Sequence, residues 1–178
     1  MDNNMKSLSY SDENDKAYGI AGMTVTLVAL DGEEYLAEIS LDAPAGETMR
    51  MSTAYGLKGN PRMSAKILWE QAVRELRLTT SMALGNLVCR RYLVDRTGVS
   101  RSETDALRKA VRTEAQDHCE LDSDEADNLF DNCLSYVDRL FRHSGVQQVT
   151  HSFADNVMRR RTMSAAEAFE LLSQLGMR

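Results

Sequence analysis

The N-terminal third of the chain alternates between apolar and polar positions, as half-buried β-strands do. Met23–Leu30 is rich in Val, Thr and Leu, and Tyr35–Leu41 alternates after it. Asp31-Gly32 stands between these runs, and because glycine accepts the positive φ of a tight turn, this step predicts a hairpin. Thr48–Tyr55 alternates again and is a candidate third strand. We therefore expect a small antiparallel β unit over residues 19–58, either a hairpin or a three-stranded sheet.

From Asn60-Pro61 onward, the apolar positions recur at helical spacing. Asparagine is a good helix N-cap, and proline suits the first helical turn. The pattern predicts one helix over residues 61–94, with Thr79–Ser81 and Gly85 as places where it could bend or break. Gly98 ends it.

Further helix starts are marked by the spacing of the capping box, in which a Ser or Asp is followed three residues later by an acid. Three such pairs occur: Ser100 with Glu103, Asp122 with Glu125, and Ser164 with Glu167. The second pair opens the most regular apolar face in the chain, from Ala126 to Phe141. A shorter apolar pattern before the third pair predicts one more helix, which ends near Arg160.

The predicted elements add up to an α+β protein that is mostly α, with a small N-terminal antiparallel sheet followed by about five helices. Residues 1–18 are polar and acidic without periodicity, and we expect them to form a mobile tail. Residues 59–178 form the helical body. We expect this body and the β unit to make one compact domain, since 178 residues are an ordinary size for one.

Charge is unevenly distributed along the chain. The total is −6, a mild argument against a general nucleic-acid coat or a binder of membrane surfaces. Residues 61–101, however, carry eight basic and three acidic side chains, whereas residues 1–60 and 102–145 each carry a net charge of −6. This basic segment either pairs with the acidic segments inside the protein or forms a contact surface for phosphate or an acidic partner.

Residues 86–112 resemble the corner of a helix-turn-helix. Such a corner needs a Gly in the turn, an apolar residue after it, a capping Ser, and a Leu nine residues past the Gly; these are Gly98, Val99, Ser100 and Leu107. Two features depart from the motif. Thr104 stands where an apolar side chain is normally buried, and Glu103 and Asp105 would face phosphate with acids. A plain structural corner between two helices is the alternative.

The candidate contacts to nucleic acid or to an acidic partner gather around this segment: Arg90, Arg91, Arg96, Arg101, Ser102, Arg108, Lys109 and Arg112. A second basic cluster, Arg159–Arg161, ends a predicted helix, where cations interact favourably with the helix dipole.

Signatures of catalysis and metal binding are absent from the sequence. It contains no GxSxG, P-loop, GxGxxG or HExxH motif. The three cysteines form no CxxC pair, and His118-Cys119 is the one close pair of zinc-type ligands. Neighbouring helix positions point about 100° apart, so these two residues do not form a site together. We predict no catalytic residue, no cofactor and no metal.

The chain shows no secretory signal and no apolar run long enough to span a membrane. An odd number of cysteines without a disulfide pattern suits a reducing cytoplasm. We therefore expect a non-catalytic cytoplasmic protein with no membrane partner, which binds another protein or associates with itself as a homodimer, because the edges of a small sheet must be covered. The alternative is a helix-turn-helix-like regulator that binds nucleic acid through residues 86–112.

Overall fold

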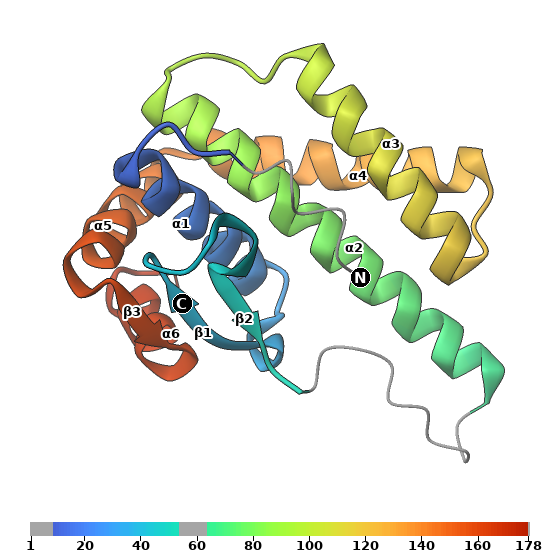
Figure 1. Cartoon of the computed structure of the whole chain (residues 1–178), viewed down its shortest axis with the longest axis horizontal. Helices are drawn as coiled ribbons and strands as arrows, with labels where there is room; N and C mark the ends of the chain where they lie inside the picture. The colour runs from blue at the N-terminus through green and yellow to red at the C-terminus, as the bar shows by residue number, and fades with distance from the viewer. Residues whose placement is uncertain (1–8, 54–63, 178) are drawn as a thin grey trace.

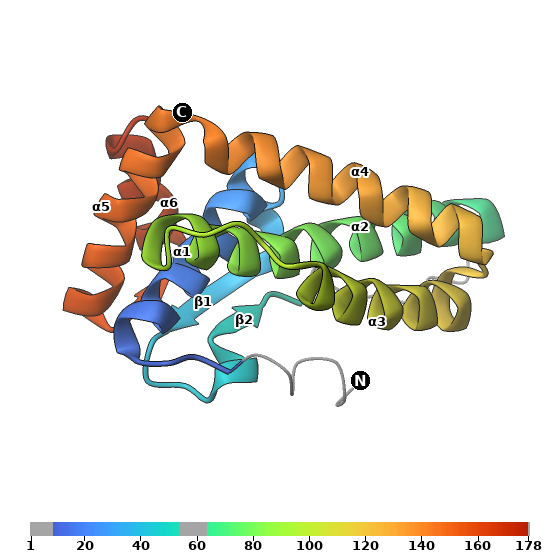
Figure 2. The ribbon, with the colours of Figure 1, turned by 90° about the horizontal axis from the view of Figure 1, so that it is seen from above.

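The computed structural model describes residues 9–53 and 64–177 and confirms the predicted class, an α+β protein that is mostly helical (Figure 1). The helix α1 (Glu13–Ala29) packs against α2 (Ala65–Cys89) and α5 (Ser144–Arg160). On the other side of α2 lie α3 (Arg101–Cys119) and α4 (Ser123–Arg142), which also contact each other (Figure 2).

The first expected strand, Met23–Leu30, is wrong, because Met23–Ala29 belongs to the helix α1 and Leu30 is its C-cap. The structure buries this helix on all sides, from Ala17 to Val28 with the exception of Tyr18, so its sequence has no polar face to reveal the helical period. The hydroxyls of Thr24 and Thr26 donate to the carbonyls four residues earlier, at 2.9 and 2.7 Å, which satisfies two polar groups that looked typical of a strand.

Two further expectations around α1 are wrong. Residues 13–18 belong to this helix and not to a mobile tail, since Asp12 caps it by accepting a hydrogen bond of 2.8 Å from the Asp15 amide. Asp31-Gly32 is not a hairpin turn between strands. Asp31 has a φ of 54° just after the helix, and a short 3₁₀ turn (Glu33–Tyr35) follows it.

The sheet has three antiparallel strands in the order β2-β1-β3. The strands β1 (Leu36–Ser40) and β2 (Met49–Met51) lie within two of the predicted runs. The third strand, β3 (Thr162–Ser164), comes from the far end of the chain and replaces the one expected at residues 23–30. Ile39 of β1 pairs with Met49 on one side and with Met163 on the other, so the sheet joins both ends of the chain.

The predicted long helix is largely correct. The helix α2 runs without a break through Thr79–Ser81 and Gly85, and it continues into a π-helical turn, η3 (Arg90–Val94). Asn60-Pro61, the expected helix start, lies outside the described residues. Ser64 caps α2 by accepting from the Ile67 amide.

All three predicted capping boxes are present, with both reciprocal hydrogen bonds, at the starts of α3, α4 and α6 (Ala165–Gln174). The helix α4 has the apolar face that its sequence predicts, with Phe130, Val137 and Phe141 completely buried. It ends at Arg142, and α5 starts at Ser144, slightly before the expected break at Gly145.

Candidate functional site

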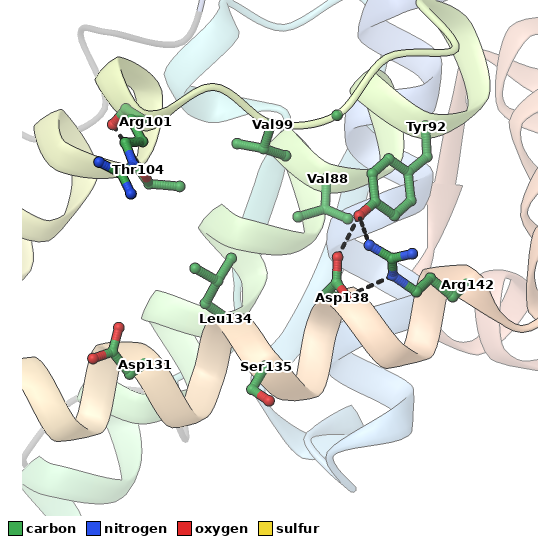
Figure 3. A pocket seen from close by; sticks show the side chains of 11 residues that line it. Val88, Tyr92, Val99, Arg101, Thr104, Asp131, Leu134, Ser135, Asp138 and Arg142 are labelled. Carbon is green, nitrogen blue, oxygen red and sulfur yellow. Dashed lines mark hydrogen bonds and ion pairs between the residues drawn. The ribbon is translucent and has the colours of Figure 1, made fainter.

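A groove of about 510 Å³ opens between the end of α2, the loop of residues 95–100, the start of α3 and the middle of α4 (Figure 3). Its floor is apolar. Val88 is buried there, and Val99 and Leu134 are partly exposed beside it. The remaining lining is polar or small: Tyr92, Gly98, Arg101, Thr104, Asp131, Ser135, Asp138 and Arg142. The volume lies within the range of about 300–1,000 Å³ that is typical of ligand pockets, and polar groups surround a small apolar floor.

One end of the groove is closed by Tyr92, Asp138 and Arg142. The Tyr92 hydroxyl donates to Oδ1 of Asp138, and Nε of Arg142 donates to Oδ2 of the same carboxylate at 2.7 Å. The Arg142 guanidinium also lies 5.6 Å from the centre of the Tyr92 ring, within the range of a cation–π contact. The polar groups of these three side chains are therefore paired with one another.

The π-helical turn helps to place Tyr92. The amide of Asp95 donates to the carbonyl of Arg90, five residues earlier, at 3.1 Å. This spacing is that of a π-helix, a rare form that occurs often at functional sites.

Burial and the hydrogen bonds of this cluster set the ionisation of Tyr92 and Asp138. Burial raises the pKa of Tyr92, and its hydrogen bond to Asp138 raises the pKa further. Burial also acts to raise the pKa of Asp138, but the hydrogen bonds from Arg142 and Tyr92 outweigh it, and the pKa is lowered. At neutral pH the tyrosine is thus protonated and the aspartate is charged, which makes neither one a base poised near neutrality.

The other end of the groove is formed by the start of α3. Ser100 caps this helix, and Oε2 of Glu103 accepts from the Ser100 amide at 3.0 Å. Arg91 donates to Oε1 of Glu103 at 2.7 Å. Burial alone would raise the pKa of Glu103, but the hydrogen bonds from Arg91 and Ser100 lower it to about 2. Glu103 is therefore occupied within the protein, and Arg101 beside it is exposed.

The eight predicted contact residues divide into two groups. Four are paired with acids of the protein itself: Arg90 with Asp15, Arg91 with Asp95 and Glu103, Arg108 with Asp127 and Asp131, and Arg112 with Asp127. The other four are exposed: Arg96, Arg101, Ser102 and Lys109. Across the described residues, none of the three cations in this second group has an ion pair. Only the second group can meet a partner without first breaking an internal salt bridge.

The corner between α2 and α3 does not use its glycine for a tight turn. The positive φ in this loop, 54°, belongs to Arg96 and not to Gly98. A Cβ built on Gly98 would meet nothing within 4 Å. Thr104, where the motif expects a buried apolar side chain, lines the groove and donates its hydroxyl to the Arg101 carbonyl at 2.9 Å. The expected glycine turn is therefore wrong.

A second pocket, of about 490 Å³, lies at the start of α1. Arg161, from the second basic cluster, extends into it and donates to Glu13 at 2.7 Å and to Asp42 at 2.9 Å. Leu41 and Ala45 are its apolar lining. Because its main charges are already paired and its apolar floor is small, this pocket is a weaker candidate than the groove.

The three cysteines belong to the buried core. Cys89, Cys119 and Cys133 are free and buried, and burial raises the pKa of each thiol. A thiol with a raised pKa forms little of the thiolate that attacks substrates or binds metal. In residues 9–53 and 64–177, no group of three or more His, Cys, Asp or Glu side chains is placed to hold a metal ion.

The native protein should therefore react slowly with Ellman's reagent, and all three thiols should react at once after unfolding in guanidinium. The relative exposures of Cys89, Cys119 and Cys133 are 0, 2 and 4%. Reagent access then requires local or global opening. A time course of absorbance with and without denaturant measures this difference. Rapid modification of any thiol in the native state would contradict the buried placement.

The groove itself was not predicted from the sequence. Tyr92 and Asp138 are 46 positions apart, and no local pattern connects them. Leu134 has a weak signal, because it lies on the apolar face of α4 but remains partly exposed. Arg101 was among the predicted contacts.

Comparison with known proteins assigns nothing to this groove. No protein-family model matches the chain, and no curated protein matches it. Among the helices that the structure describes, none combines the length and the apolar character needed to cross a membrane. The geometry of the groove is therefore the observation from which a function can be proposed.

Proposed function

We propose that this protein acts without catalysis, by binding a short segment of another protein in the groove between α2, α3 and α4. The observation that carries this proposal is the apolar floor, where Val99 and Leu134 are partly exposed beside the buried Val88, between two charged ends. Protein interfaces have this plan, with an apolar centre and a polar rim. The three free, buried thiols support a reducing compartment, and we propose the cytoplasm.

Partner binding accounts for the groove better than nucleic-acid binding does. A run of phosphates along α3 would meet the acids Glu103, Asp105 and Asp131 as well as Arg101, whereas a peptide segment needs no anion beside these acids. Four of the seven predicted cations are already held in salt bridges. The helix-turn-helix alternative, through residues 86–112, remains the competing outcome of the experiment.

Self-association through the sheet is also less favoured than the groove. The edge strands β2 and β3 have only three residues each. Short edges are one of the ways in which proteins prevent strands from pairing between molecules. A homodimer in which a second copy occupies the groove remains one form of the proposed binding.

The test selects short random peptides on the full chain and measures their affinity by fluorescence polarisation. Leu134→Asp should weaken the selected peptides about 10- to 100-fold, since burial of a leucine contributes about 1.5–3 kcal/mol. Asn132→Asp is the matched control: it adds the same charge at an exposed position of α4 that does not line the groove, and it should leave binding unchanged.

Three outcomes are informative. Peptides that depend on Leu134 support the proposal, as does a dimer in light scattering that Leu134→Asp dissociates. Peptides that bind the wild-type chain and Leu134→Asp with equal affinity overturn the proposal. Salt-sensitive binding of duplex DNA that is lost in Arg101→Ala, without any peptide that depends on Leu134, replaces it with the nucleic-acid alternative. Circular dichroism establishes that each variant is folded.

A further inference from the structure

Resting on the proposed function, we propose that the groove selects partner segments in which an apolar side chain stands next to a carboxylate, with Arg101 as the partner of that carboxylate. The groove is thus specific for acidic–apolar peptide segments.

The first step is the charge that the groove leaves uncompensated. Four charged side chains line it: Arg101, Asp131, Asp138 and Arg142. Arg142 and Asp138 pair with each other, and Asp131 pairs with Arg108. Arg101 has no ion pair within residues 9–53 and 64–177, so the lining has one open charge, and it is positive.

The second step is where this charge lies. Figure 3 shows Arg101 with Thr104 at one end of the groove, and the Tyr92–Asp138–Arg142 cluster at the other. Arg101 is the first residue of α3, and its side chain is exposed. The planar guanidinium suits a carboxylate, with which it can form two parallel hydrogen bonds.

The third step is that one occupant must match both the apolar floor and the charge of Arg101. Val99 and Leu134 lie between the two ends of the groove (Figure 3). A segment that places an apolar side chain on this floor and runs toward the Arg101 end of the groove brings a neighbouring residue to Arg101. A basic neighbour would meet Arg101 with like charge, so the groove discriminates against basic segments as well as in favour of acidic ones.

The test pans a library of short random peptides separately on the wild-type chain and on Arg101→Glu. The wild-type chain should enrich sequences with Asp or Glu beside Leu, Ile or Phe, and Arg101→Glu should enrich Lys or Arg at the same place. For acidic peptides selected on the wild type, Arg101→Glu should weaken binding about tenfold or more, with the effect reduced by salt. Lys109→Glu is the matched control, because it reverses an exposed cation of α3 that does not line the groove.

The outcomes separate the two proposals. A switch of the enriched charge with Arg101→Glu and none with Lys109→Glu supports the inference. The inference is overturned, and the proposed function stands, if the selected peptides depend on Leu134 but carry the same charge beside the apolar residue in the wild-type and Arg101→Glu selections. If no peptide from either selection depends on Leu134, the inference fails, and the proposed function fails with it unless the chain forms a dimer that Leu134→Asp dissociates.

Discussion

Replacing Arg90 with Met should lower the free energy of unfolding by about 3–5 kcal/mol, the range for breaking a buried ion pair by removing one partner. Arg90 donates from Nε to Oδ1 of Asp15 and from Nη2 to Oδ2, both at 2.6 Å. It also donates to the Ser9 carbonyl at 2.9 Å and lies 4.7 Å from the centre of the Tyr10 ring. Methionine keeps most of the volume but leaves the Asp15 charge buried and unpaired. Urea unfolding measures the loss.

The matched control is Arg142→Met, which removes an arginine from an exposed pair. The Arg142 side chain is 67% exposed, whereas that of Arg90 is 9% exposed. Exposed pairs contribute about 0–1 kcal/mol, so the control should change stability little. Equal losses in the two variants would show that the Arg90 network does not hold the N-terminal segment on α2.

The dependence on pH gives a second measurement of the same pair. In the folded protein, burial acts to raise the pKa of Asp15, but the hydrogen bonds from Arg90 and Ser11 outweigh it, and the pKa is lowered. A lowered folded pKa contributes stability above the unfolded value, near 3.9, which is lost as the pH falls through the folded pKa. In Arg90→Met, burial should raise the pKa of Asp15, because the opposing hydrogen bonds from Arg90 are gone. Protonation of Asp15 should then restore part of the stability that the variant has lost. Its deficit should therefore be smaller near pH 4 than at pH 7, and a deficit that grows on acidification would contradict this assignment.

Gly22→Ala should destabilise the protein by about 1–3 kcal/mol or more, the cost of overpacking a tight contact. At this position α1 and α2 touch through their backbones. An added Cβ would lie 2.3 Å from the Gly85 carbonyl oxygen and 2.6 Å from the Cys89 Cβ. A backbone oxygen cannot move aside as a flexible side chain can, so the two helices must separate. Alanine is the better helix former by about 1 kcal/mol, and the expected sign is therefore opposite to that of helix propensity.

Gly98→Ala is the control for this effect. No atom lies within 4 Å of the Cβ it would add, and the residue has no positive φ. It should be neutral or slightly stabilising, by up to about 1 kcal/mol, through the lower entropy of the unfolded chain. Thermal unfolding of both variants measures the difference. A Gly22→Ala protein as stable as Gly98→Ala would show that the helices are not in backbone contact there.

The parts of the fold that the sequence predicts well depend on contacts between close neighbours in the chain. Each capping box needs one hydroxyl or carboxylate and one acid three residues later, and all three form. The apolar face of α4 is visible because its other face is exposed, so the period of the helix appears in the sequence. The same reasoning fails for α1, where burial on all sides removes the period that distinguishes a helix from a strand.

By itself, the sequence determined the class of the fold, the starts of α3, α4 and α6, and the two strands β1 and β2, because short-range hydrogen bonds and one-sided burial decide these features. The tertiary structure decided the rest. It placed β3 from residues 162–164 beside β1, and it paired Arg90 with Asp15, 75 positions away. It also held four of the predicted contact arginines in internal salt bridges and left Arg101 free at the end of an apolar groove. Pairing of charges and the opening of a groove depend on which distant segments meet, and no local pattern of residues specifies that meeting.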